Sequence, residues 1–133
     1  MITRETDYAI RAILGLAQAH GAGRVMSVAE LAKRMEIPYR FVRALSRKLV
    51  AARLVASKRG HGGGLILARA PKSISMLDVV RAMTPASMVL NRCLLTPAEC
   101  PRSGHCPVHR QLGTLQGKLE TMLKKLRFDQ LTE

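Results

Sequence analysis

The spacing of apolar and polar residues predicts helices along the first third of the chain. Residues 4 to about 19 form the first predicted helix, because Ile10 and Leu14 lie one turn apart on the same face. Ser27 and Glu30 have the spacing of a capping box, in which each side chain satisfies a free N–H group at a helix start. They predict a second helix, which is short.

The third predicted helix has an apolar face and a basic face. Pro38 suits its first position, where the missing N–H group has no partner inside a helix. Phe41, Leu45 and Leu49 share one face at about 100° per residue. Three arginines lie on roughly the opposite face: Arg40, Arg43 and Arg47. One side of this helix therefore packs inward, while the other presents a row of guanidinium groups.

Two strand-like runs, residues 54–57 and 65–68, flank a glycine-rich stretch and predict a β-hairpin. Glycine supplies the positive φ angles that such a tip needs. Ser75 then marks the start of a fourth helix that runs to about Met83 and is closed by Pro85. Two helices joined by a tight turn and followed by a hairpin make a winged helix-turn-helix.

A seam of apolar residues runs along the last predicted helix, which begins at Pro107. Its members recur at steps of four and three residues: Val108, Leu112, Leu115, Leu119, Met122 and Leu126. Such a seam on a terminal helix needs a partner, and packing against a second copy of the chain would give a two-fold dimer. The alternative is that the helix folds back onto its own domain.

The predicted fold class is mainly α. It is a winged helix-turn-helix DNA-binding domain with a two-stranded β wing and a long C-terminal dimerisation helix. We divide the chain into the DNA-binding domain at residues 1–83, a cysteine-containing loop at 84–106, and the dimerisation helix with a C-terminal tail at 107–133. The loop shows no clean hydrophobic period.

The charge of the chain points to a polyanionic partner. The 133 residues carry a net charge of +13, and the first 75 hold 14 basic and 4 acidic residues. Only 3% of the residues are aromatic, which removes the usual stacking surfaces for single-stranded nucleic acid and leaves double-stranded DNA as the expected partner. Neither a secretory signal nor a membrane span can be drawn, so we expect a cytoplasmic protein with no membrane partner.

The third helix and the hairpin tip supply the candidate DNA contacts. In helix-turn-helix proteins the second helix of the motif enters the major groove, where arginine can donate two hydrogen bonds to guanine. The candidates are Tyr39, Arg40, Arg43, Arg47 and Lys48 on the helix, with Lys58, Arg59 and His61 at the wing. The alternatives are a merely solvated basic face and a hairpin that only connects two strands.

The candidate metal ligands of the chain are its three cysteines, Cys93, Cys100 and Cys106. An odd number of cysteines without an export signal disfavours a disulfide framework. Thiolates are soft ligands that suit iron-sulfur clusters and zinc, and Pro101 and Pro107 stiffen the chain directly after two of the cysteines. The alternative is three small buried side chains without a function.

Three cysteines leave a fourth ligand position open, and two residues compete for it. His109 follows Cys106 by one turn and offers an imidazole. Asp7 lies in line with the inward residues of the first helix, where an unpaired carboxylate is costly, so it needs a salt bridge, a hydrogen-bond network or a metal. The alternatives are a surface histidine and an aspartate stabilised by the helix dipole.

Four features carry a resemblance to a known family. They are Thr6-Asp7-Tyr8-Ala9-Ile10-Arg11-Ala12, the helix-turn-helix from Ser27 to Leu54, the wing Lys58-Arg59-Gly60-His61-Gly62-Gly63-Gly64 and the three-cysteine loop. Together they resemble the Rrf-type family of bacterial transcription regulators, which includes iron-sulfur regulators of the IscR-like group and nitric-oxide-sensing repressors of the NsrR-like group. The resemblance covers essentially the whole chain.

The resemblance implies a homodimeric winged-helix regulator with a [2Fe–2S] or [4Fe–4S] cluster held by Cys93, Cys100 and Cys106. Asp7 matches the aspartate that NsrR-like members take from the partner subunit, and His109 matches the histidine after the third cysteine in IscR-like members. We therefore expect a repressor, not an enzyme, that binds a pseudo-palindromic operator and responds to redox state, nitric oxide or iron-sulfur status. The alternatives are a zinc or thiol-disulfide sensor on the same scaffold and an iron-sulfur carrier.

Overall fold

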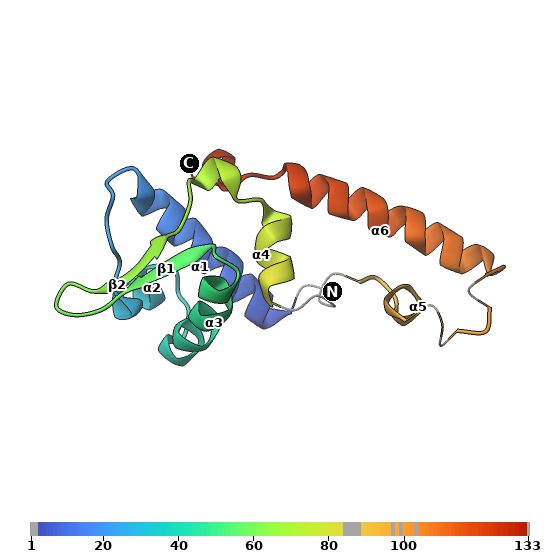
Figure 1. The fold of residues 1–133 in the computed structure, drawn as a ribbon, viewed down its shortest axis with the longest axis horizontal. Helices are drawn as coiled ribbons and strands as arrows, with labels where there is room; N and C mark the ends of the chain where they lie inside the picture. Colours follow the sequence, from blue (N-terminus) through green and yellow to red (C-terminus); the bar gives the residue numbers. More distant parts are fainter. Residues whose placement is uncertain (1–2, 84–88, 97, 99, 103, 133) are drawn as a thin grey trace.

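The computed structural model describes residues 3–83, 89–96, 98, 100–102 and 104–132. A rounded body with a projecting hairpin stands at one end of the molecule, and a long helix extends from it as an arm (Figure 1). In chain order the elements are α1 (Arg4–His20), α2 (Val28–Arg34), α3 (Tyr39–Ala51), β1 (Val55–Lys58), β2 (Gly64–Leu67), η1 (Pro71–Ser73), α4 (Met76–Met83), α5 (Arg92–Leu95), α6 (Pro107–Lys125) and η3 (Phe128–Leu131). The mainly helical winged fold predicted from the sequence is confirmed.

Side-chain caps fix the starts of the helices. The Ser27 hydroxyl accepts a hydrogen bond from the Glu30 main-chain N–H at 3.1 Å, which is one half of the predicted capping box. The Glu30 carboxylate does not complete the box but pairs with the Arg24 guanidinium. At the start of α4, the Ser75 N–H donates to the Asp78 carboxylate at 2.8 Å and the Asp78 N–H donates to the Ser75 hydroxyl at 3.1 Å. Pro38 lies one position before α3 because its ψ of 132° is extended. Pro85, expected to close α4, lies outside the described residues.

The hairpin is attached to the segment that precedes α2. Strands β1 and β2 are antiparallel, with Val55 opposite Leu67. Leu65 exchanges main-chain hydrogen bonds of 2.7 and 2.9 Å with Met26. Gly64 makes this approach possible, because its φ of +154° disfavours other residues and a Cβ atom there would overlap the Met26 main chain. The wing is therefore held at a fixed place beside the helix-turn-helix.

The core of the body includes the C-terminal end of the chain. Phe128 in η3 is 0% exposed and belongs to the same cluster as the buried residues of α1, α3 and the hairpin. Its N–H donates to the Ile74 carbonyl at 3.1 Å, and the Met76 N–H donates to the Leu126 carbonyl at 2.8 Å. After α6 the chain thus returns to the body, and the C-terminal tail helps to close the core.

The apolar seam of α6 divides into two rows. Leu112 and Leu119 are half-buried, whereas Val108, Leu115 and Met122 are 62%, 53% and 66% exposed. Leu123, which lies outside the predicted seam, is the residue of α6 that is buried, against Leu77 and Val80 of α4. The end of α6 therefore folds back onto its own chain, as the alternative interpretation held, while one row of the seam stays open.

The segment before α6 contains a short helix that the sequence pattern did not predict. Helix α5 holds Cys93. Leu90, two residues before α5, donates its N–H to the Gln116 side chain at 2.9 Å, which attaches this segment to α6. Four residues are too short for a hydrophobic period to reveal. Among the described helices, none is long and apolar enough to cross a membrane.

Candidate nucleic-acid interface and cysteine loop

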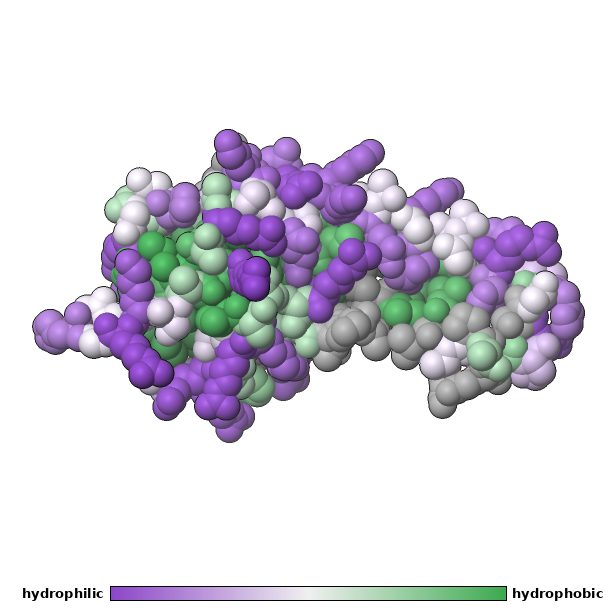
Figure 2. Space-filling view, viewed as in Figure 1, coloured by the Kyte–Doolittle hydropathy of each residue, from purple (hydrophilic) through white to green (hydrophobic). Residues whose placement is uncertain are grey.

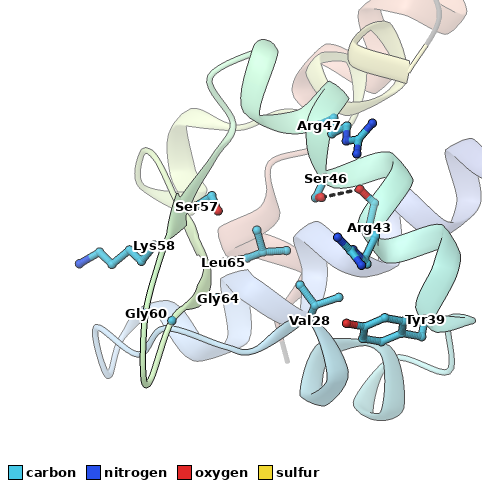
Figure 3. A pocket seen from close by; sticks show the side chains of 11 residues that line it. Val28, Tyr39, Arg43, Ser46, Arg47, Ser57, Lys58, Gly60, Gly64 and Leu65 are labelled. Atoms are coloured by element: carbon cyan, nitrogen blue, oxygen red, sulfur yellow. Dashed lines mark hydrogen bonds between the residues drawn. The ribbon is translucent and has the colours of Figure 1, made fainter.

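A groove of about 680 Å³ lies between α3 and the hairpin. Figure 3 shows α3 side chains along one wall and hairpin residues along the other. The lining residues with side chains are Val28, Tyr39, Arg43, Ser46, Arg47, Ser57, Lys58 and Leu65. Arg43, Arg47 and Lys58 are exposed, and the Lys58 side chain extends away from α3 (Figure 3). A groove with this charge suits a phosphate backbone and the base edges beside it.

Glycines shape the tip of the wing. Gly60 and Gly62 have φ angles of +97° and +77°, and the Gly63 N–H donates to the Gly60 carbonyl at 2.9 Å. A Cβ atom on Gly63 would overlap the Lys58 carbonyl. This tight turn holds Arg59 and His61 exposed at the far end of the hairpin, where hydrophilic side chains cover the surface (Figure 2).

Two other candidate DNA contacts face groups of the protein itself. The Arg40 guanidinium lies 5.2 Å from the centre of the Phe41 ring. The Lys48 ammonium forms an ion pair with Glu5 at 2.9 Å. Phe41, expected to be fully inward, is half-buried, and Val42 takes the buried position beside Leu45.

Sequence reasoning missed four residues whose side chains line the groove: Val28, Ser46, Ser57 and Leu65. Ser46 lies three residues after Arg43, so the helical period could have placed it on the same face. Its hydroxyl donates to the Arg43 carbonyl at 2.8 Å (Figure 3). Val28 and Ser57 come from other elements, and only the packing of the hairpin against the helix-turn-helix brings them to α3.

The three cysteines lie along one loop and have free thiols. All three are half-buried; Cys93 lies in α5, and Cys106 is the N-cap residue of α6. Among the described residues, no three Cys, His, Asp or Glu side chains are close enough together to hold a metal ion. The structure therefore puts the predicted ligands on neighbouring segments without gathering them around one point.

Cys106 has the chemistry of a thiolate ligand. The main-chain N–H of His109 lowers the pKa of the Cys106 thiol below its ordinary value; partial desolvation opposes this shift, and the Val108 N–H and the Arg102 charge add to it. The start of a helix favours a negative charge in this way because its first N–H groups have no partner within the helix. A thiolate here would bind a soft metal more readily than a neutral thiol.

The two candidate fourth ligands have different surroundings. The Nδ1 atom of His109 is buried and has no hydrogen-bond partner among the described residues. The Asp7 carboxylate pairs with the Arg11 guanidinium at 2.9 Å, with the two side chains 48% and 40% exposed. Asp7 is thus more exposed than its place in line with inward residues suggested, and of the three partners expected for it, Arg11 one turn later supplies a salt bridge. Three thiols and an imidazole nitrogen without a partner fit, as donors, an iron-sulfur cluster or zinc.

A family model covers nearly the whole chain. The model of the Rrf2 family, described as "Iron-dependent Transcriptional regulator", matches residues 2–133. The chain belongs to the Rrf2 family. The resemblance drawn from the sequence motifs is thereby confirmed, and so is the expectation of a transcriptional regulator in place of an enzyme.

Individual Rrf2-type proteins agree with this assignment. An rrf2-like HTH-type transcriptional regulator of Rhodobacter capsulatus is 36% identical over 83 residues, which cover 61% of this chain and 55% of that protein. The HTH-type transcriptional repressor NsrR of Streptomyces coelicolor is 28% identical over 115 residues, covering 86% of this chain and 76% of the repressor. The solved structure of T. potens IscR superposes with a TM-score of 0.73 at 24% identity, covering 98% of this chain and 85% of that one. The match to the Rhodobacter relative thus spans about half of its length.

Proposed function

We propose that this Rrf2-family chain is a sequence-specific repressor that binds double-stranded DNA as a homodimer. The groove between α3 and the hairpin carries the proposal, because basic residues of both elements line it, Arg43 and Arg47 from α3 and Lys58 from the hairpin. The groove also has the arrangement of a winged helix-turn-helix, in which the second helix of the motif reads the major groove.

The two walls of the groove have different tasks in this proposal. Arg43 and Arg47 reach base edges from α3, since a guanidinium can donate two hydrogen bonds to guanine. Tyr39 stands at the start of the same helix and is 52% exposed. Lys58, Arg59 and His61 meet phosphates or the minor groove from the wing, and such contacts set the register of the protein on DNA.

A second copy of the chain covers the open row of α6. Val108, Leu115 and Met122 lie at steps of seven residues and are more than half exposed. Packing this row against its symmetry mate makes a two-fold dimer and sets two α3 helices on half-sites about 34 Å apart. The operator is then pseudo-palindromic.

The cysteine loop is the sensor in this proposal. Cys93, Cys100 and Cys106 would hold an iron-sulfur cluster, with Asp7 or His109 in the fourth position. The cluster, when bound, supplies a centre whose integrity depends on oxygen, nitric oxide and iron supply. Cys106 is the N-cap residue of α6 and Cys93 lies in α5, so ligation would draw the loop against the dimerisation helix and fix the spacing of the two reading helices.

A titration of one operator duplex tests the switch. We expect the anaerobically purified protein and the same protein after removal of iron to differ in operator affinity by about 10-fold or more at one stated salt concentration. Equal affinity of the two forms would contradict the sensor while leaving the DNA-binding proposal intact. A control with all three cysteines changed to serine should match the iron-free form.

An absorption spectrum of the anaerobic protein tests the ligands. Protein with an iron-sulfur cluster is brown and contains acid-labile sulfide, whereas a Cys₃His zinc site gives colourless protein. The unpartnered Nδ1 atom of His109 makes zinc the second candidate. His109→Ala and Asp7→Ala, measured side by side, separate the two fourth ligands, because only the change at the true ligand alters the visible bands. A spectrum that neither change alters would exclude both residues as the fourth ligand.

A further inference from the structure

The first two turns of α1 contact the reading helix and the turn before it. Helix α1 crosses behind α3 in the body (Figure 1). Three of its side chains, Glu5, Tyr8 and Arg11, each meet a different part of the helix-turn-helix. None of the three lines the groove, so their contacts need an explanation apart from direct contact with DNA.

Glu5 meets the far end of α3. Its carboxylate accepts a hydrogen bond from the Lys48 ammonium at 2.9 Å, and the two side chains are 38% and 41% exposed. The pair joins residues 43 positions apart in the chain, so it links two separate helices. A lysine that is engaged by a carboxylate in this way has its charge neutralised before DNA arrives.

Tyr8 meets the start of α3. Its ring centre lies 5.2 Å from that of Phe41, with the planes inclined by 49°. Arginines flank both rings: the Arg11 guanidinium lies 5.5 Å from the centre of Tyr8, and that of Arg40 lies 5.2 Å from the centre of Phe41. Contacts of these kinds each stabilise a fixed ring orientation. The four side chains form a stack that runs from α1 to the first turn of α3.

Arg11 meets the tight turn between α2 and α3. Its Nη1 atom donates to the Glu36 carbonyl at 3.3 Å, while its Nη2 atom pairs with Asp7. Glu36 has a φ of +55°, which is uncommon for a residue other than glycine. The hydrogen bond therefore holds the part of the motif whose backbone decides the angle between the two helices.

We infer that Glu5, Tyr8 and Arg11 are positioning residues for DNA reading and that Lys48 belongs to this brace instead of contacting a phosphate. The inference rests on the proposed function and names what orients its reading helix. Contacts at the start of α3, at its end and at the turn before it fix both the tilt and the rotation of the helix. Loss of one of these contacts would keep every groove side chain but would turn α3, so that its side chains no longer align with the bases.

The salt dependence of binding separates a brace from a phosphate contact. Each phosphate contact adds about 0.9 to the slope of log K against log salt concentration for duplex DNA. We expect Lys48→Met to lower the affinity about 2- to 5-fold with an unchanged slope. Lys58→Met is the matched control, since it removes the same group from the wing and should lower the slope by about 0.9. The probe is a duplex that the wild-type protein selects from a random library.

Replacing Glu5 changes the affinity for DNA in opposite directions depending on whether Lys48 is part of the brace or contacts a phosphate, and Glu36 provides the control. Glu36→Gln removes one negative charge beside α3; no ion pair of its side chain is present in the described part of the chain, so this change should raise affinity slightly. Glu5→Gln removes the same charge but breaks the brace, so it should lower affinity about as much as Lys48→Met. If Lys48 contacts DNA, Glu5→Gln frees it and raises affinity instead.

Exchanging the charges of Glu5 and Lys48 tests the role of this ion pair even if the single variants fold poorly. The double variant Glu5→Lys with Lys48→Glu restores the ion pair in reverse and should recover most of the wild-type affinity. A further loss of binding in the exchanged variant, or a slope that falls by about 0.9 for Lys48→Met, would overturn the inference. These results compare variants with wild type, so failure of the wild-type protein to select any duplex tells separately against the proposed function.

Discussion

The rounded body, which contains α3 and the hairpin, and the α6 arm differ in how their apolar residues are covered. In the body, Val42 and Leu45 of α3 and Phe128 near the C-terminal end of the chain are completely buried in one core. In the arm, Leu115 and Met122 are 53% and 66% exposed, and the buried contact is made by Leu123 near the end that touches α4. A core closed by one chain needs no partner, whereas an open apolar row on a helix is stabilised only when something covers it. Under the proposed function, the body would position the DNA contacts by itself, whereas the arm would depend on assembly.

The polar groups of the two regions can be compared in the same way. In the body, Glu5 and Asp7 have basic partners in the same chain. The Nδ1 atoms of His20 in the body and of His109 in the arm are both buried without a partner among the described residues, so an unpartnered imidazole is not peculiar to the arm. The arm differs in Cys106, whose thiol has a pKa lowered chiefly by the His109 main-chain N–H at the start of α6.

The largest effect is expected where the chain end enters the body. Phe128→Ala should lower the free energy of unfolding by about 3–5 kcal/mol, because it removes a fully buried ring and leaves a cavity. Urea denaturation followed by circular dichroism measures the loss. Phe41→Ala makes the same change at a half-buried position and should cost clearly less. Equal losses at the two positions would show that the C-terminal end is not part of the core.

The next largest effect is expected on the open row of α6. Leu115→Asp should convert the dimer to monomers in sedimentation velocity and lower operator affinity about 100-fold, because two linked half-site contacts become independent. The free energy of unfolding of the body should change by less than about 0.5 kcal/mol. Thr121→Asp places the same charge on another face of the helix and should stay dimeric. A dimer that survives Leu115→Asp would place the interface elsewhere.

A smaller effect separates the arginines of α3. Arg43→Ala should reduce discrimination between the operator and a duplex with one altered base pair by about 1–3 kcal/mol, since it lines the groove. Arg40→Ala should retain that discrimination, because its guanidinium lies over Phe41. Competition binding at a fixed salt concentration measures both. Loss of discrimination in the Arg40 variant alone would reverse their roles.

The smallest effect concerns the thiol at the start of α6. In metal-free protein, the pH at which alkylation of Cys106 reaches half its maximal rate should lie below that of the same residue in urea, because the lowered pKa favours the thiolate at a lower pH. Mass spectrometry of the alkylated peptide follows this one cysteine. The pKa shift depends on the folded helix. Equal alkylation midpoints in the folded protein and in urea would show that the start of α6 does not lower the pKa of Cys106.

Much of the body could be predicted from local sequence signals. Ser27 and Ser75 announce helix starts through hydrogen bonds that span three residues, and the glycines of the wing announce a turn with positive φ angles. Arg43 and Arg47 could be assigned to the groove because the helical period alone sets their direction. These signals act within a few residues, so they do not depend on the rest of the fold.

The surroundings of several predicted site residues depend on contacts that a periodic pattern does not contain. Lys48 pairs with Glu5, which lies 43 positions away, and Arg40 lies over Phe41, which packs against Tyr8 of α1. The roles of Lys48 and Arg40 at DNA stay predictions. Asp7 pairs with Arg11 one turn later in the same helix, and a salt bridge was one of the three partners expected for it. The apolar seam of α6 was predicted as one stripe, yet contact with α4 draws one side of it inward. A periodic pattern gives the face of a helix but not which neighbour that face meets.

The sequence by itself determined the order of the elements, the basic face of α3, the glycine turn of the wing and the cysteine spacing, because each follows from backbone preferences or from residue type. Only the tertiary structure decided that Phe128 closes the core, that the first turns of α1 hold α3, and that a row of α6 stays uncovered. Those outcomes depend on which surfaces meet when the chain collapses, and burial of apolar area is a property of the whole packed chain and not of any single segment.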